Sequence, residues 1–150
     1  CDCRVVAPLF AADRLDHLLN GENGLCQAVE SGVTVLTDRY YFSSYAYQGV
    51  DFPLDWVIEL NRPCAQLLRP SATIFIDVSP ELALERIAQN RANVELFETR
   101  ERLTRTREQY FRAFELQKDA ENIVIIPGGR DITAIAQDIW TSVTSLLSDA

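Results

Sequence analysis

The 150-residue sequence contains no methionine, only one lysine (Lys118) and no long apolar run. Without a methionine the chain does not begin at a natural start codon, so we expect a processed protein or a fragment. No apolar run approaches the roughly 20 residues of a membrane span, and no signal-peptide pattern opens the chain. The net charge of −8 argues against nonspecific nucleic-acid binding. These absences predict a cytoplasmic protein without membrane or nucleic-acid partners.

Cysteine and glycine are also sparse. The four cysteines, Cys1, Cys3, Cys26 and Cys64, lack the spacing of a zinc site, so reduced thiols are expected. None of the six glycines is followed by lysine, so the sequence has no G-x-x-x-x-G-K-[ST] phosphate-binding loop. The apolar content of 47% and the charged content of 24% are ordinary, and the length suits one domain over residues 1–150.

The most informative stretch is residues 37–49, which reads T-D-R-Y-Y-F-S-S-Y-A-Y-Q-G. The β-branched run at 33–36, bounded by Gly32, predicts a buried strand leading into it. Asp38 and Arg39 then stand where that strand ends, and ligands bind at the carboxyl ends of strands in open α/β sheets. The Arg39 guanidinium is a planar fork of donors that suits a phosphate. The alternative is a local ion pair in a loop.

The remaining pattern alternates helices and strands, which predicts an α/β fold with a parallel sheet and flanking helices. A first helix is indicated by apolar residues at helical spacing from Leu9 to Leu19. Pro63 is expected to break a later helix that starts near Pro53. Ser79, followed by proline and glutamate, is typical of a helix start. The other predicted segments are a short helix at about 25–30, strands at 73–77 and 123–126, and helices from 80 to about 91 and from 132 to about 147. A long amphipathic helix with Leu103, Tyr110, Phe111 and Phe114 inward is expected between residue 98 and the last of these strands.

Residues 37–49 resemble the signature of the thymidylate kinase family, roughly D-R-[YH]-x-x-S-[ST]-x-A-[YF]-[QT]-G. Residues 76–81 (I-D-V-S-P-E) and 104–110 are similar to further family elements, L-D-V-x-P-E and R-x-R-x-x-Y. The resemblance implies a P-loop nucleoside monophosphate kinase fold. It also implies transfer of the ATP γ-phosphoryl group to dTMP with Mg²⁺, in dTTP biosynthesis, by a cytoplasmic homodimer.

The resemblance also assigns a thymine site to the first predicted helix. Phe10 and Arg14 are four residues apart, on one helix face. By resemblance the Phe10 ring stacks on the base and Arg14 bonds its carbonyl edge; the alternative is a core phenylalanine beside a solvated arginine. Arg39 would contact the dTMP phosphate as a catalytic residue. Asp38 would act through a water on the magnesium, and no residue is assigned as a direct metal ligand.

Further roles follow by resemblance within the same stretch. Ser43 and Ser44 stand where family members place a polar group near the base. Tyr47 stands where an aromatic ring lies against the deoxyribose and disfavours a 2′-hydroxyl, and Gln48 would approach the base. We therefore expect these residues to share one pocket with Phe10, Arg14 and Arg39.

The ATP side is expected in the second half of the chain. The segment at about 91–98 corresponds to the family's mobile lid, with Arg86 and Arg91 beside it. Arg91 is the candidate catalytic arginine of the lid, and the alternative is a solvated helix face. Gly128 and Gly129 lie in the loop that passes beside the adenine in the family.

The family comparison leaves two main hypotheses open. Relative to the family, the first strand, the P-loop, the first helix and the second strand are missing, so the predicted sheet is incomplete and its apolar faces are expected to be exposed. Either the chain is most of a dTMP kinase and is inactive alone, or it is a noncatalytic nucleotide-binding or dimerising remnant. A different nucleoside monophosphate kinase is a weaker alternative, against which the Phe10/Arg14 pair and Tyr47 argue.

Overall fold

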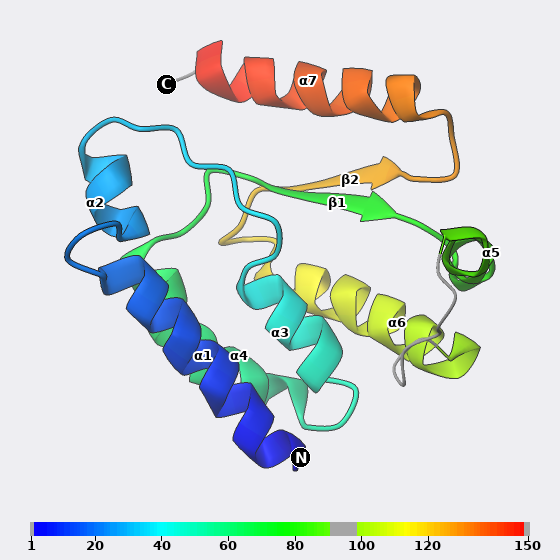
Figure 1. The fold of residues 1–150 in the computed structure, drawn as a ribbon, viewed down its shortest axis with the longest axis horizontal. Helices are drawn as coiled ribbons and strands as arrows, with labels where there is room; N and C mark the ends of the chain where they lie inside the picture. The colour runs from blue at the N-terminus through cyan, green and yellow to red at the C-terminus, as the bar shows by residue number, and fades with distance from the viewer. Residues whose placement is uncertain (1, 91–98, 149–150) are drawn as a thin grey trace. The chain divides into compact units, whose positions relative to one another are not determined.

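The computed structural model describes residues 2–90 and 99–148 (Figure 1). The chain forms two compact units, which are described separately below. The first unit comprises Cys1–Arg69 with Thr106–Ala113, and the second comprises Pro70–Arg105 with Phe114–Ala150. The elements in chain order are α1 (Cys3–Leu19), α2 (Leu25–Glu30), α3 (Tyr41–Gln48), α4 (Leu54–Leu67), β1 (Thr73–Asp77), α5 (Pro80–Asn90), α6 (Arg100–Gln117), β2 (Ile123–Pro127) and α7 (Ile132–Ser148).

In the first unit, α1 packs on α2, α3 and α4. The helix begins at the N-cap Asp2, whose carboxylate accepts a hydrogen bond from the backbone N–H of Arg4. Its buried face carries Ala7, Ala11 and Leu18. The sequence pattern pointed instead to a stripe starting at Leu9, whose side chain is exposed. Small alanines let the neighbouring helices approach closely, which is why they, and not Leu9, form the contact face.

The helix α4 is continuous through Pro63, so the predicted break there is wrong. Proline removes one N–H donor from the helix and leaves the carbonyl of Glu59 without its usual bond. Both residues are exposed, so water can satisfy that carbonyl. Trp56 of the same helix is exposed and packs against Phe52, with ring centroids 5.4 Å apart.

The strand predicted at residues 33–36 is also wrong. The described residues form one sheet, in which β1 pairs only with β2. The segment 33–36 is not a strand of this sheet. A strand requires a hydrogen-bonded neighbour, and apolar composition cannot supply one. The side chain of Leu36 is 95% exposed as a result. The preceding Gly32 stands just after the C-cap of α2 and has a φ of 81°.

In the second unit, β1 and β2 are parallel, in register from Thr73↔Ile123 to Asp77↔Pro127. In Figure 1, α7 follows β2 and runs alongside it. Phe75 of β1 packs edge-on against Phe114 of α6 at 5.1 Å. The parallel strands with flanking helices confirm the predicted α/β class.

The sheet of the second unit leaves apolar side chains open to solvent. Ile76 of β1 and Ile125 of β2 are both exposed.

The helix α5 begins at Pro80 as predicted, and the Ser79 hydroxyl accepts a hydrogen bond from the backbone N–H of Leu82 at 3.3 Å. Among the described helices, none combines the length and apolar character needed to cross a membrane.

Candidate functional site

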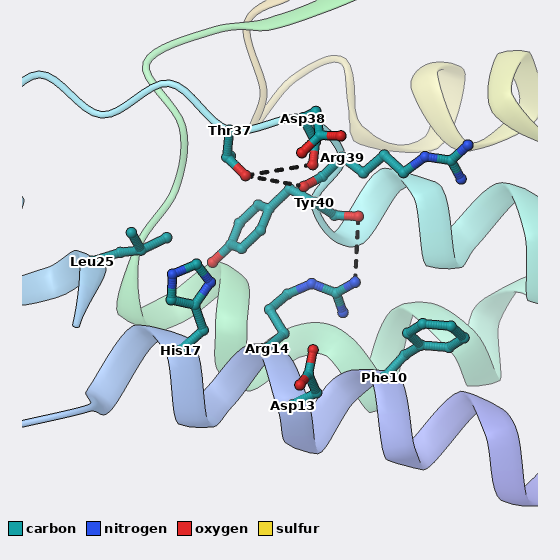
Figure 2. Close-up of a pocket in the computed structure, with 9 residues that line it drawn as sticks. All are labelled: Phe10, Asp13, Arg14, His17, Leu25, Thr37, Asp38, Arg39 and Tyr40. Atoms are coloured by element: carbon teal, nitrogen blue, oxygen red, sulfur yellow. Dashed lines mark hydrogen bonds between the residues drawn. The ribbon is translucent and has the colours of Figure 1, made fainter. Parts of the chain in front are cut away.

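A cavity of about 250 Å³ lies in the first unit, between α1, the start of α2 and the segment that leads into α3 (Figure 2). It brings together three residues that the sequence analysis assigned to dTMP, Phe10, Arg14 and Arg39, and it also includes Asp38, which was assigned to the magnesium. The complete lining is Phe10, Asp13, Arg14, His17, Leu25, Thr37, Asp38, Arg39 and Tyr40.

Arg14 is held from several sides at the floor of this cavity. Its guanidinium donates to Oδ1 of Asn61, to Oγ of Ser44 at 3.1 Å and to the backbone carbonyl of Tyr40 at 3.5 Å. The Tyr40 ring also lies against it, 5.6 Å from the guanidinium carbon. The last two contacts place Arg14 beneath Tyr40 in Figure 2. Arg14 is therefore oriented by the protein before any ligand arrives.

Tyr40 links this arginine to α4. Its hydroxyl donates to the carbonyls of Cys64 at 3.2 Å and Leu68 at 3.1 Å. Burial raises the pKa of the Tyr40 hydroxyl, so it stays a neutral donor. Burial likewise raises the pKa of the Cys64 thiol, and the charge of Arg14 only partly opposes that shift. Neither group is poised to act as a nucleophile.

Arg39 stands out because its backbone is left-handed, with a φ of 64°. This conformation costs a non-glycine residue roughly 1–2 kcal/mol, and such strain clusters at functional sites. In Figure 2 the Arg39 side chain extends away from Arg14. Its guanidinium lies 5.0 Å from the centre of the Tyr47 ring and donates to the Tyr47 hydroxyl at 3.5 Å. The two arginines thus share one cavity but point in different directions.

The other predicted base-site residues lie outside the cavity lining. Ser43 shares a hydrogen bond of 3.1 Å with the Tyr110 hydroxyl, and the Tyr47 and Tyr110 rings meet edge to face at 6.4 Å. Burial raises the pKa of Tyr110. Gln48 has a buried Oε1 with no hydrogen-bond partner in the described part of the chain. The structure therefore forms two groups, one around Arg14 and one around Tyr110. Arg39 lines the cavity with Arg14, and its side chain contacts Tyr47 of the second group.

Asp38 is exposed at the rim of the cavity, next to Arg39. Within the described residues no group of three His, Cys, Asp or Glu side chains could enclose a metal ion. Mg²⁺ does not need such a cage, because it usually keeps several waters and binds one or two carboxylates plus substrate phosphates. A single open carboxylate such as Asp38 fits that mode of binding.

The residues expected on the ATP side lie in the second unit. Arg86 donates to the backbone carbonyl of Gly128 at 2.9 Å, and the N–H of Gly128 donates to the carbonyl of Asp77 at 2.7 Å. A Cβ at Gly128 would lie 2.6 Å from a methyl of Val78, so only glycine fits there. Gly129 has more room. The proposed lid at 91–98, including Arg91, lies outside the described residues.

The sequence analysis gave no role to Asn61, Asp13 or His17. Asp13 and His17 line the cavity, and Asn61 accepts a hydrogen bond from Arg14. A signal for Asn61 was present, since it interrupts a stripe on α4 that is otherwise apolar, from Leu54 to Cys64. A polar residue in such a stripe needs a buried partner.

Comparison with known proteins gives consistent matches. The sequence profile of the family described as "Thymidylate kinase" matches residues 2–139. A probable thymidylate kinase of Methanococcoides burtonii is 32% identical over 93% of this chain and 68% of its own length. A probable thymidylate kinase of Pyrobaculum calidifontis is 36% identical (92% and 66%), and a thymidylate kinase of Geobacillus thermodenitrificans 34% (97% and 65%). The chain thus spans about two thirds of the length of these three relatives.

Proposed function

The chain belongs to the thymidylate kinase family, and we propose that it is part of an enzyme that transfers the γ-phosphoryl group of ATP to dTMP. The fold of this family is that of the P-loop nucleoside monophosphate kinases. The observation that carries this proposal is the cavity of the first unit. Arg14 and Arg39, from segments far apart in sequence, both line it, and Arg39 does so in a strained backbone conformation. Strain of this kind persists where a side chain must be aimed at a ligand.

The divergent arginines suit the two ends of one nucleotide. Arg14, oriented by its neighbours, would donate to a carbonyl of thymine, and Phe10, half exposed beside it, is free to stack on the ring. Arg39 would reach the 5′-phosphate, where a charge-assisted hydrogen bond is strong. Tyr47, in contact with Arg39, would lie between them against the deoxyribose.

ATP and Mg²⁺ complete the proposed reaction. Mg²⁺ supplies charge that neutralises the phosphate oxygens, and Asp38 would hold one of its waters. Arg86, Arg91, Gly128 and Gly129 are proposed for the ATP side. We also propose, from the family resemblance, a cytoplasmic homodimer that acts in dTTP biosynthesis.

A binding experiment tests the dTMP site. Isothermal titration of residues 1–150 with dTMP should show binding, and Arg39→Ala should weaken it roughly 10- to 150-fold, since a hydrogen bond to a charged group contributes about 1.5–3 kcal/mol. Arg62→Ala is the matched control, because Arg62 is exposed and pairs with Glu59 on α4, outside the cavity. Equal affinities for the unaltered chain and Arg39→Ala would contradict the phosphate assignment.

A kinetic experiment separates the enzyme from a noncatalytic nucleotide-binding module. Phosphoryl transfer depends on holding the phosphates in line, and this sequence has no glycine-lysine loop to hold those of ATP. Residues 1–150 alone should therefore show no turnover in a coupled ADP-release assay. A fusion to a segment that carries a G-x-x-x-x-G-K-[ST] loop should show it. Turnover of about 1–100 per second by the unfused chain would contradict the first expectation, and an inactive but dTMP-binding fusion would favour the noncatalytic module.

A further inference from the structure

Asn61 is the one fully buried polar side chain among the described residues of α4. Its neighbours on the buried stripe, Val57 and Cys64, are also 0% exposed. Both polar atoms of the amide are used: Nδ2 donates to the carbonyl of Val57 at 2.9 Å, and Oδ1 accepts from Nη1 of Arg14. An amide buried at this depth is costly unless both atoms are bonded, so the Arg14 contact is part of the reason it is tolerated.

The bond to Val57 fixes the direction of the Asn61 oxygen. Nδ2 is tied to the carbonyl of its own helix one turn earlier, so Oδ1 must point away from the α4 backbone, toward α1. Arg14 meets it there and is bonded on its other side by Ser44 and the Tyr40 carbonyl. These contacts involve both terminal nitrogens of the guanidinium, and Arg14 also lines the cavity in which a ligand would bind.

We propose that Asn61 is a positioning residue that sets the base specificity of the site by locking the Arg14 guanidinium; this rests on the function proposed above. Thymine and cytosine differ at the pyrimidine C4, where thymine carries a carbonyl acceptor and cytosine an amino donor. A guanidinium is donor-only, so a fixed one accepts the carbonyl and opposes the amino group. A guanidinium free to rotate can turn its donors away from that amino group and loses the discrimination. Sites that impose a fixed hydrogen-bond pattern reject mismatched analogues most strongly.

The variants separate positioning from packing. Asn61→Leu keeps a similar volume but removes the acceptor, and Asn61→Asp keeps an oxygen that can accept from Arg14. Asn61→Ala also removes the amide but adds no branched side chain, so it replaces Asn61→Leu in the experiment if the leucine variant does not fold. Asn122→Leu is the control, because Asn122 lies in the second unit and its amide donates to the carbonyl of Ser71 there. Urea unfolding of each variant reports whether it is folded.

The measurement is the ratio of the dCMP and dTMP dissociation constants for residues 1–150, from isothermal titration. We expect Asn61→Leu and Asn61→Ala to reduce this ratio at least tenfold, and Asn61→Asp and Asn122→Leu to keep it within about threefold of the unaltered chain. A merely structural role would weaken both nucleotides in parallel, and an unchanged ratio in a folded Asn61→Leu or Asn61→Ala variant would overturn the proposal. If the unaltered chain itself does not prefer dTMP, the proposed function fails first and this proposal with it, so the two failures are distinguishable.

Discussion

The backbone of Arg39 allows a sharp test of the idea that strain is retained there for function. Consider Arg39→Ala and Arg39→Gly. Both remove the guanidinium and its contact with the Tyr47 ring, so those losses cancel when the two variants are compared. The two variants then differ in the cost of the left-handed backbone, with φ at 64°, and in the backbone entropy lost on folding.

The size of the difference follows from two opposing effects. Alanine pays roughly 1–2 kcal/mol to adopt the left-handed conformation, which glycine adopts freely. Glycine in turn loses roughly 0.5–1 kcal/mol more backbone entropy on folding than alanine does. The two ranges leave Arg39→Gly about 0–1.5 kcal/mol more stable than Arg39→Ala, and the centre of that range is about a fourfold difference in the ratio of folded to unfolded protein.

Urea unfolding followed by circular dichroism measures this difference, and Arg62 on α4 supplies a control of opposite sign. Arg62 is an exposed position in the interior of α4, so Arg62→Gly should be about 0.8–1 kcal/mol less stable than Arg62→Ala. Both Arg39 variants should also lose dTMP affinity equally, because neither retains the guanidinium. An Arg39→Ala variant more stable than Arg39→Gly would show that the backbone is not strained, and dTMP binding in only one of them would refute the shared loss of a phosphate contact.

Three further predictions concern the sugar, high pH and the second unit. Tyr47→Ala should reduce the ratio of the dissociation constants of the ribonucleotide and dTMP, and titration with both nucleotides measures this ratio. An unchanged ratio would show that Tyr47 does not contact the sugar. The pKa of Tyr40 is raised by burial, so its stabilising effect is complete below the ordinary tyrosine pKa of about 10 and is lost as the pH rises toward the folded value. The urea concentration at the unfolding midpoint should fall as the pH rises above 10, and it should fall less steeply in Tyr40→Phe than in the unaltered chain. Equal slopes of midpoint against pH in the two proteins would contradict this. Gly128→Ala should destabilise the chain by about 1–3 kcal/mol in urea unfolding, because its Cβ would overlap neighbouring methyls. Gly129→Ala, whose Cβ meets its nearest neighbour at 3.7 Å, should cost less, and equal losses would contradict the reasoning.

Local signals in the sequence were sufficient for most of the helices and for the strands of the sheet. The serine, proline and glutamate at 79–81 marked the start of α5, and the apolar runs at 73–77 and 123–126 are β1 and β2. These signals work because a cap, a helix period or a β-branched run acts within a few residues. The short helix α2 was likewise predicted.

Two local predictions were wrong because the deciding interactions are not local. The run at 33–36 has strand composition, but it has no paired neighbour among the described residues, and pairing defines a strand. Pro63 is a helix breaker by propensity, but packing along the buried face of α4 outweighs the loss of one exposed hydrogen bond. In both cases tertiary context decided the outcome.

The candidate site divides in the same way. The sequence identified Arg14, Arg39 and Tyr47 by their place in motifs, since residue type and spacing are readable in one dimension. Only the tertiary structure could show that Asn61, 47 residues from Arg14, holds that arginine, because nothing local to either residue encodes the bond. It also decided that Ser43 bonds Tyr110, 67 residues away, and does not face the cavity. The sequence thus determined which chemical groups are present, whereas folding brought distant helices together and set the direction in which each group points.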